Sequence, residues 1–229
     1  MAQKQFILSL LIVTWLAFLA SCSNEPAKDF TLTDEAGYET VARLETTQGP
    51  ITIRFHSERA PAHVANFVNL CGRGFYNGTY FHRVSPEFLI QGGDPNTLDD
   101  DFANDGLGGH TYAGPQTTLR MEAPDHSGYS RGDVAMARTS QVNSAGSQFF
   151  ILLSERASLD GPYTVFGEVV TGIEVADRIS EEPGAPIGGL GGFNPEVPQY
   201  IEECVLEELP QKVKGGLGPG GREKETMDQ

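Results

Sequence analysis

The stretch VARLETTQGPITIRF (residues 41–55) alternates apolar and polar residues on either side of Gln48 and Gly49. Alternation with a period of two is typical of a strand that buries one face and exposes the other. Two such runs separated by a short polar pair indicate a tight turn between them. The stretch therefore predicts two antiparallel strands joined as a hairpin.

Two segments further along the chain have helical spacing instead. RAPAHVANFVNLCGRGF places Pro61 where a first helical turn accepts proline, and its apolar residues fall on one face, at Val64, Phe67, Val68 and Leu70. A second helix is predicted in TGIEVADRISEEPG, from near Thr171 to before Pro183. Short apolar runs such as DVAMAR, QFFILL and YTVFGEVV lie between glycine, asparagine and proline. Two helices among many short strands favour a closed barrel or a sandwich.

The first 22 residues, MAQKQFILSLLIVTWLAFLASC, carry one positive charge before an apolar run over residues 6–20. That run is shorter than the ~20 residues that span a membrane. It predicts a secretory signal peptide over residues 1–21. The ending LASC resembles a bacterial lipobox, in which Cys22 is lipidated and becomes the mature N-terminus. The alternative is an ordinary signal peptide with an incidental cysteine.

The composition of the rest of the chain indicates its domain organisation and excludes some classes of partner. Residues 22–40 are polar and predict a tether, and residues 211–229 are rich in glycine and charge and predict a disordered tail. A formal net charge of -15 would repel a phosphate backbone, so nucleic acid is excluded as a partner. The five histidines are scattered, and no metal site or cofactor is predicted.

The segments APAHVANFVNLCGRGFYNGTYFHRVSPEFLIQGGD, DVAMAR, NSAGSQFFILL and LDGPYTVFGEVV together resemble the cyclophilins, the peptidyl-prolyl cis-trans isomerases. The match runs over residues 41–209, with the motifs in the family's order and spacing. The resemblance implies a mainly β domain over residues 41–210. Its fold would be a closed, eight-stranded antiparallel β-barrel with two capping α-helices and a shallow groove on the outside.

The resemblance also implies the site residues. Arg83 and Gln91 take the catalytic positions, with Arg83 as the donor and Gln91 either binding the substrate backbone or orienting Arg83. The expected substrate-binding positions are Phe88, Leu89, Ala137, Arg138, Gln148, Phe150, Leu159 and Tyr163. Among these, Phe88, Leu89, Phe150 and Leu159 would seat the proline ring. Tyr163 stands where many relatives have histidine. Alternation along a strand points His82 to the face opposite Arg83.

An arginine among apolar residues suits rotation about the bond before proline. That rotation is opposed by amide resonance, with a barrier of ~18–20 kcal/mol. Midway through it the prolyl nitrogen becomes pyramidal, so a hydrogen-bond donor aimed at this nitrogen binds the twisted state best. No metal, cofactor or covalent intermediate is required. The predicted enzyme is a peptidyl-prolyl cis-trans isomerase acting on proline-containing exported proteins; the alternative is a proline-binding or chaperone module with incidental catalysis.

Further expectations concern location, assembly and thiols. Ser23 after the lipidated cysteine favours the outer membrane of the bacterial cell envelope, facing the periplasm, over the inner membrane. The chain is expected to be a monomer. We expect Cys71 and Cys204 to be free, buried thiols, with a disulfide as the alternative because the compartment is oxidising. Ser158 stands where cyclosporin-sensitive relatives carry tryptophan, which predicts poor sensitivity. The role of the glycine-rich insertion at residues 184–195 is left open.

Overall fold

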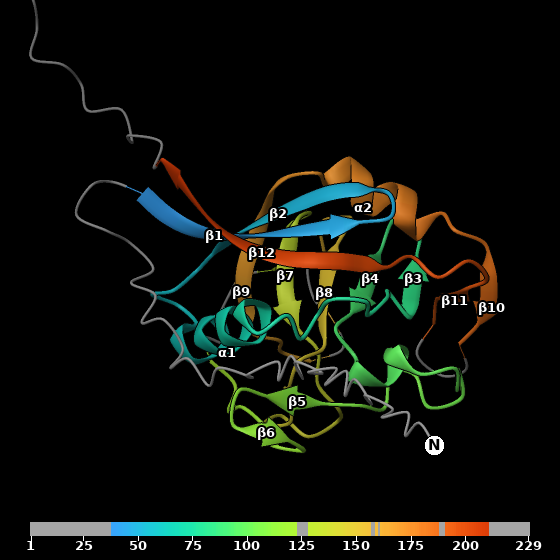
Figure 1. Cartoon of the computed structure of the whole chain (residues 1–229), viewed down its shortest axis with the longest axis horizontal. Helices are drawn as coiled ribbons and strands as arrows, with labels where there is room; N and C mark the ends of the chain where they lie inside the picture. The colour runs from blue at the N-terminus through green and yellow to red at the C-terminus, as the bar shows by residue number, and fades with distance from the viewer. Residues whose placement is uncertain (1–37, 123–127, 157–158, 160, 188–190, 211–229) are drawn as a thin grey trace, which may run out of the picture.

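The computed structural model describes residues 38–122, 128–156, 159, 161–187 and 191–210, which form a twisted sheet with two α-helices packed against it (Figure 1). The helices are α1 (Pro61–Gly72) and α2 (Ile173–Ser180), with one 3-10 turn, η1 (Pro95–Leu98). In chain order the strands are β1 (Tyr38–Thr46), β2 (Gly49–Phe55), β3 (Arg83–Ser85), β4 (Leu89–Gly92), β5 (His110–Thr111), β6 (Gly114–Pro115), β7 (Asp133–Met136), β8 (Phe149–Leu152), β9 (Val165–Thr171), β10 (Gly184–Pro186), β11 (Phe193–Pro195) and β12 (Ile201–Pro210). The expectation of a mainly β fold with two helices is confirmed.

The hairpin predicted from residues 41–55 is present as β1 and β2. The two strands pair antiparallel, with Leu44 opposite Ile51 and Thr46 opposite Gly49 at the turn. On its other side β1 pairs with β12, so the N-terminal hairpin and the last strand lie side by side (Figure 1). The alternation of the sequence therefore places Leu44 and Ile51 together in the buried core.

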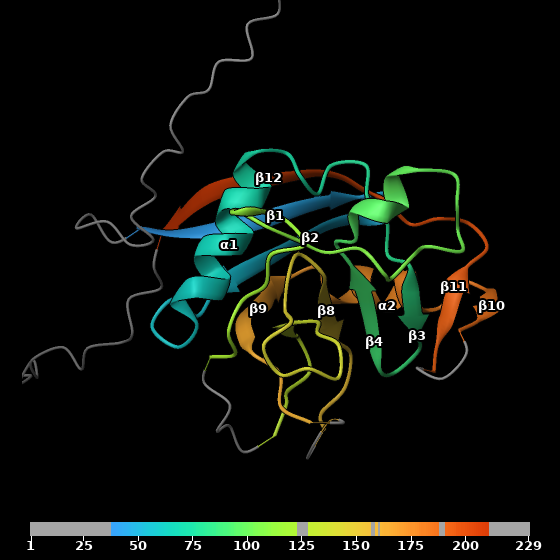
Figure 2. The same cartoon turned by 90° about the horizontal axis from the view of Figure 1, so that it is seen from below.

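The two helices cover different parts of the sheet. Helix α1 packs against β9 and β12, whereas α2 packs against β2, β3 and β4, as the two views show (Figure 2). The buried face of α1 inserts Phe67 among aromatic rings, 5.4 Å from the ring centre of Phe149 and 5.2 Å from that of Phe166. Both helices begin and end close to the residues that the sequence predicts.

The sheet differs from the eight closed strands that were expected. Ten strands form one ladder in the order β10-β11-β3-β4-β8-β7-β9-β2-β1-β12, with β10 and β12 as its ends. The two additional strands come from the glycine-rich insertion, since Phe193 of β11 pairs with Val84 of β3. Backbone hydrogen bonds also join the segment before β3 to the start of β12 and the residues before it: Ile201 N–H donates to Thr79 O at 2.8 Å, and Phe81 N–H donates to Gln199 O at 3.0 Å.

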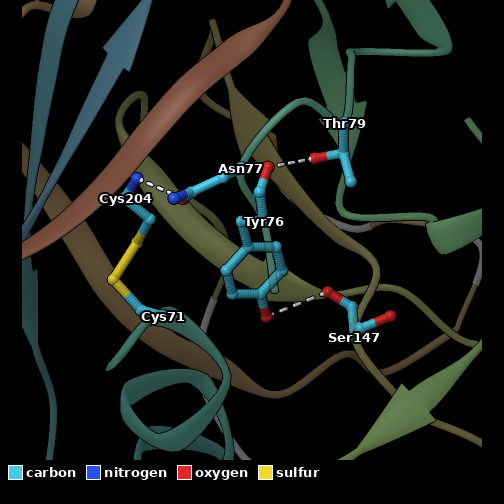
Figure 3. Close-up of a disulfide and its surroundings, with 6 residues drawn as sticks. All are labelled: Cys71, Tyr76, Asn77, Thr79, Ser147 and Cys204. Carbon is cyan, nitrogen blue, oxygen red and sulfur yellow. Dashed lines mark hydrogen bonds between the residues drawn. A yellow bond between two sulfur atoms is a disulfide. The ribbon is translucent and has the colours of Figure 1, made fainter. Parts of the chain in front are cut away.

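The expectation of free thiols is wrong, because Cys71 and Cys204 form a disulfide (Figure 3). Helix α1 ends against β12, which brings the two Cα atoms to 5.4 Å. That spacing is in the range a disulfide requires, and nothing in a separation of 133 residues indicates it. The N–H of Cys204 also donates to Asn77 Oδ1 at 2.9 Å, so α1, the following loop and β12 are tied at one place.

Several sequence expectations fall on residues outside the described part of the chain. These are the signal peptide, Cys22, the tether up to residue 37, Ser158 and the tail over residues 211–229. Within the described residues, no helix is long and apolar enough to cross a membrane.

Candidate active site

The register of the sheet places the two expected catalytic residues in one row with the apolar seat. Arg83 of β3 lies opposite Gln91 of β4, and Gln91 lies opposite Phe150 of β8. Directly opposed residues of paired strands share a face. The next row of the same three strands, in which Val84 pairs with Ile90 and Ile90 with Ile151, points to the other face of the sheet and is fully buried in the core. Arg83, Gln91 and Phe150 therefore lie on the outer face of the sheet.

The expected seat is a second apolar cluster, separate from the main core. Leu89 and Phe150 are buried in it, and four other predicted residues pack against it while partly exposed: Phe88, Ala137, Leu159 and Tyr163. The ring of Tyr163 meets that of Phe150 edge to face, with centres 5.3 Å apart. The structure thus brings together six of the predicted substrate-binding residues. They form an apolar surface that stays open to solvent on one side.

The same cluster contains residues that the sequence reasoning missed: Tyr129, Ala135, Leu152 and Val165. Leu152 lies two residues after Phe150 in β8, and Ala135 of β7 lies two residues before Ala137. Alternation along these strands could therefore have predicted both residues. Tyr129 carries no such signal. Its hydroxyl accepts the N–H of Tyr163 at 3.0 Å, which holds the backbone beside the seat.

Two neutral oxygens of the described residues accept hydrogen bonds from the guanidinium of Arg83. Its Nη1 donates to Gln91 Oε1 at 3.2 Å, and its Nε donates to the carbonyl oxygen of Gly191 at 2.9 Å. Its central carbon lies 6.0 Å from the ring centre of Phe88. Burial lowers the pKa of Arg83 from its ordinary value, and the nearby Tyr163 opposes this shift. An arginine with so high an ordinary pKa remains a cation at neutral pH.

The two glutamines continue the contacts of Arg83 toward a loop. Gln91 Nε2 donates to Gln148 Oε1 at 2.9 Å. Gln148 Nε2 in turn donates to the carbonyl oxygens of Gly108 at 2.6 Å and Gly106 at 3.0 Å. Because each amide both accepts and donates, the side chain of Gln91 has one orientation in this chain of contacts. Gln91 therefore orients Arg83, and Gln148 orients Gln91.

Ala137 and Arg138 border the seat at the end of β7. The N–H of Ala137 donates to the carbonyl oxygen of Gln148 at 2.8 Å, which fixes the backbone here. The resemblance implies that Arg138 is a substrate-binding residue, and the structure shows what its side chain contacts. The guanidinium carbon lies 4.6 Å from the ring centre of Tyr163, and Nε donates to Pro162 O at 2.8 Å.

His82 is buried and does not belong to the apolar core. A side-chain carbon built on Gly106 would lie 3.4 Å from its Cδ2, so the imidazole packs under the loop that holds Gln148. Burial lowers the pKa of His82 to about 4, so the ring is neutral at neutral pH. With 4% of its surface exposed, His82 offers little area for direct contact with a substrate.

Comparison with known proteins gives one consistent result. The model of the family described as cyclophilin type peptidyl-prolyl cis-trans isomerase matches residues 41–204. A peptidyl-prolyl cis-trans isomerase A from Dickeya dadantii is 41% identical over 168 residues, covering 71% of this chain and 82% of the relative. A peptidyl-prolyl cis-trans isomerase from Acinetobacter baylyi is 38% identical over 154 residues, covering 65% and 76% respectively.

Solved structures agree with these relatives. A crystal structure of a cyclophilin type peptidyl-prolyl cis-trans isomerase from Cryptosporidium parvum superposes with a TM-score of 0.64 at 28% identity, covering 75% of this chain and 99% of that one. A second, described as in the presence of dipeptide ala-pro, gives a TM-score of 0.63 at 28% identity, covering 73% and 98%. The chain therefore belongs to the cyclophilin family and is a peptidyl-prolyl cis-trans isomerase.

Proposed function

We propose that Arg83 supplies the catalytic hydrogen bond by donating to the pyramidal prolyl nitrogen of the half-rotated bond. The planar isomers have no lone pair localised on that nitrogen, because it is delocalised into the amide. A donor placed there stabilises the transition state more than either ground state, which is the condition for acceleration. Lowering the barrier by ~7 kcal/mol accelerates the exchange by ~10⁵-fold.

The observation that carries this proposal is the row formed by Arg83, Gln91 and Phe150 on the outer face of the sheet. The row sets a cation beside an apolar surface that can seat a proline ring. Its neighbours Phe88, Leu89, Leu159 and Tyr163 extend that surface. A ring held there would bring the bond before proline within reach of the guanidinium.

The partners of Arg83 suit this role. Gln91 Oε1 and the Gly191 carbonyl oxygen are neutral, so they orient the guanidinium without cancelling its charge. Orientation before the substrate binds removes the entropy cost of ordering a long side chain during the reaction. Gln91 is thus proposed as a positioning residue, and Ala137, Arg138 and Gln148 as the border that holds the residue before proline.

The proposed substrates are proline-containing segments of exported, unfolded polypeptides. The Cryptosporidium relative solved in the presence of dipeptide ala-pro supports a short X-Pro unit as the recognised element. The sequence of residues 1–22 supports export, lipidation of Cys22 and attachment to a membrane. Ser23 favours the outer membrane on the periplasmic side, and we propose a monomer that is held there by its acyl chains.

The test is a comparison of Arg83→Ala with Arg83→Lys in an isomerisation assay on an X-Pro peptide. Arg83→Ala should lower kcat steeply while KM changes little, because the donor acts on the twisted state alone. Arg83→Lys should recover part of the activity, since an ammonium keeps the charge and loses the planar arrangement of donors. A large rise in KM with an unchanged kcat would favour the proline-binding module instead.

A further inference from the structure

The hairpin formed by β10 and β11 lies against β3, at one end of the sheet (Figures 1 and 2). Arg83 is the first residue of β3. The N–H of Ile187 donates to the carbonyl oxygen of Gly192 at 3.0 Å, which links the two sides of the hairpin. The neighbouring carbonyl oxygen, that of Gly191, accepts the Nε–H of Arg83 at 2.9 Å. The insertion therefore places a backbone acceptor directly on the proposed catalytic side chain.

Gly192 shows how closely the hairpin approaches. Its φ is +94°, in the left-handed region that favours glycine. A Cβ atom added there would lie 2.8 Å from the carbonyl oxygen of Val84 and 3.4 Å from Cγ of Arg83. The hairpin backbone thus packs on the aliphatic part of Arg83 while the next carbonyl binds its guanidinium.

A second contact joins the hairpin to the loop that holds Gln148. Asn194 Nδ2 lies 3.5 Å from Asp105 Oδ2, and the same carboxylate accepts a hydrogen bond from the Tyr80 hydroxyl. The residue after Asp105 is Gly106, whose carbonyl oxygen accepts Gln148 Nε2 at 3.0 Å. The contacts therefore form a ring. From Arg83 they pass through Gln91 and Gln148 to the loop that contains Asp105 and Gly106. From this loop they return to Arg83 through Asn194 and the hairpin.

We propose that the β10–β11 hairpin is a positioning element for catalysis, in which the Gly191 carbonyl fixes the plane of the Arg83 guanidinium relative to the seat. The Gly191 carbonyl accepts at Nε, on a different edge of the guanidinium plane from the Nη1 contact with Gln91. Contacts on two edges restrict rotation of that plane more than the Nη1 contact does by itself. Gly191 and Gly192 act through Arg83, and the inference rests on the proposed role of Arg83.

The test compares Gly192→Ala with Gly114→Ala in the full chain. Gly114 in β6 also has a positive φ, +126°, but a Cβ there would meet nothing within 4 Å, so it reproduces the backbone strain alone. Gly192→Ala should lower kcat about tenfold, as expected for loss of one hydrogen bond to a charged group, with KM changed less than about twofold. Gly114→Ala should keep the kcat of the parent.

A spectroscopic measurement distinguishes positioning from general stability. In ¹H–¹⁵N spectra the Nε–H of Arg83, assigned by its loss in Arg83→Lys, should exchange slowly with water in the parent and rapidly in Gly192→Ala. Asn194→Ala adds no backbone strain. It should also raise the exchange rate and lower kcat, each by a smaller factor than Gly192→Ala does.

Three results would overturn the inference: an Arg83 Nε–H that exchanges rapidly in the parent, a Gly192→Ala protein that keeps the parent kcat, or equal losses in Gly192→Ala and Gly114→Ala. Failure of the proposed function is recognised separately. In that case Arg83→Ala retains full turnover even though the Nε–H of the parent is protected.

Discussion

Breaking the disulfide between Cys71 and Cys204 should lower the free energy of unfolding by several kcal/mol. The bond closes a loop of 133 residues, most of the folded domain. In the chain-entropy treatment a loop of this length restricts the unfolded chain by ~5 kcal/mol, and loss of a native disulfide typically costs about 2–5 kcal/mol. Both cysteines are buried in the main core, so their packing also contributes in the folded state.

Three samples separate the contribution of the disulfide bond to stability from that of the packing of the two side chains. They are the oxidised parent, the parent reduced by dithiothreitol, and a Cys71→Ala/Cys204→Ala variant. The reduced parent keeps both sulfur atoms and loses only the bond. Guanidinium unfolding should be followed by far-ultraviolet circular dichroism, because the single tryptophan, Trp15, lies in the predicted signal peptide. The reduced parent should unfold at a clearly lower denaturant concentration, and the alanine variant at a similar or still lower one.

Two outcomes would refute the reasoning. If reduction leaves the unfolding midpoint unchanged, the bond does not restrict the unfolded chain. If thiol titration of the unfolded, unreduced protein finds both Cys71 and Cys204 free, the bond itself is absent.

The other predictions concern the seat, the buried histidine and the anchor. Phe150→Ala removes a buried ring from the seat, so KM for an X-Pro peptide should rise about tenfold or more and turnover should fall, as steady-state kinetics would show; an unchanged KM would place the proline elsewhere. His82 has a pKa of about 4 when folded against 6.5 when unfolded, so the unfolded chain binds the additional proton between these values. The free energy of unfolding should then fall by up to ~3 kcal/mol as pH decreases from 6.5 to 4. In denaturation experiments His82→Leu should flatten this slope, while the contributions of His56 and His63, whose pKa values burial also lowers, remain; an equal slope in both proteins would exclude His82 as its cause. Cys22→Ala should move the protein from the membrane fraction to the soluble fraction, and mass spectrometry of the parent should find acyl chains on Cys22; an unmodified Cys22 would exclude the anchor.

The sequence predicts those parts of the fold in which apolar side chains recur with the period of a strand or a helix. Alternation over residues 41–55 predicts β1 and β2, and apolar spacing after Pro61 predicts α1. The resemblance selects Arg83, Gln91 and Phe150, and the register of β3, β4 and β8 brings these three residues into one row, while their roles stay a prediction. In each of these cases the information lies in side chains close together in sequence or within a family motif.

The remaining features depend on backbone groups and on contacts between distant segments. The β10–β11 hairpin comes from a glycine- and proline-rich insertion without apolar alternation, so its strands carry no periodic signal. The contact of Gly191 with Arg83 uses a carbonyl oxygen, which every residue has. The disulfide depends on how α1 docks on β12, and spacing in the sequence does not encode that distance.

The most direct test of the proposed mechanism is cis-trans exchange of a short X-Pro peptide, measured by NMR with the parent and with Arg83→Ala. Circular dichroism should first confirm that the variant is folded. The account predicts that Arg83→Ala slows exchange by orders of magnitude, while the affinity of the peptide for the apolar seat falls much less. Exchange at the parent rate in a folded Arg83→Ala protein would contradict the mechanism, because the bond would then rotate without the donor on which the proposal depends.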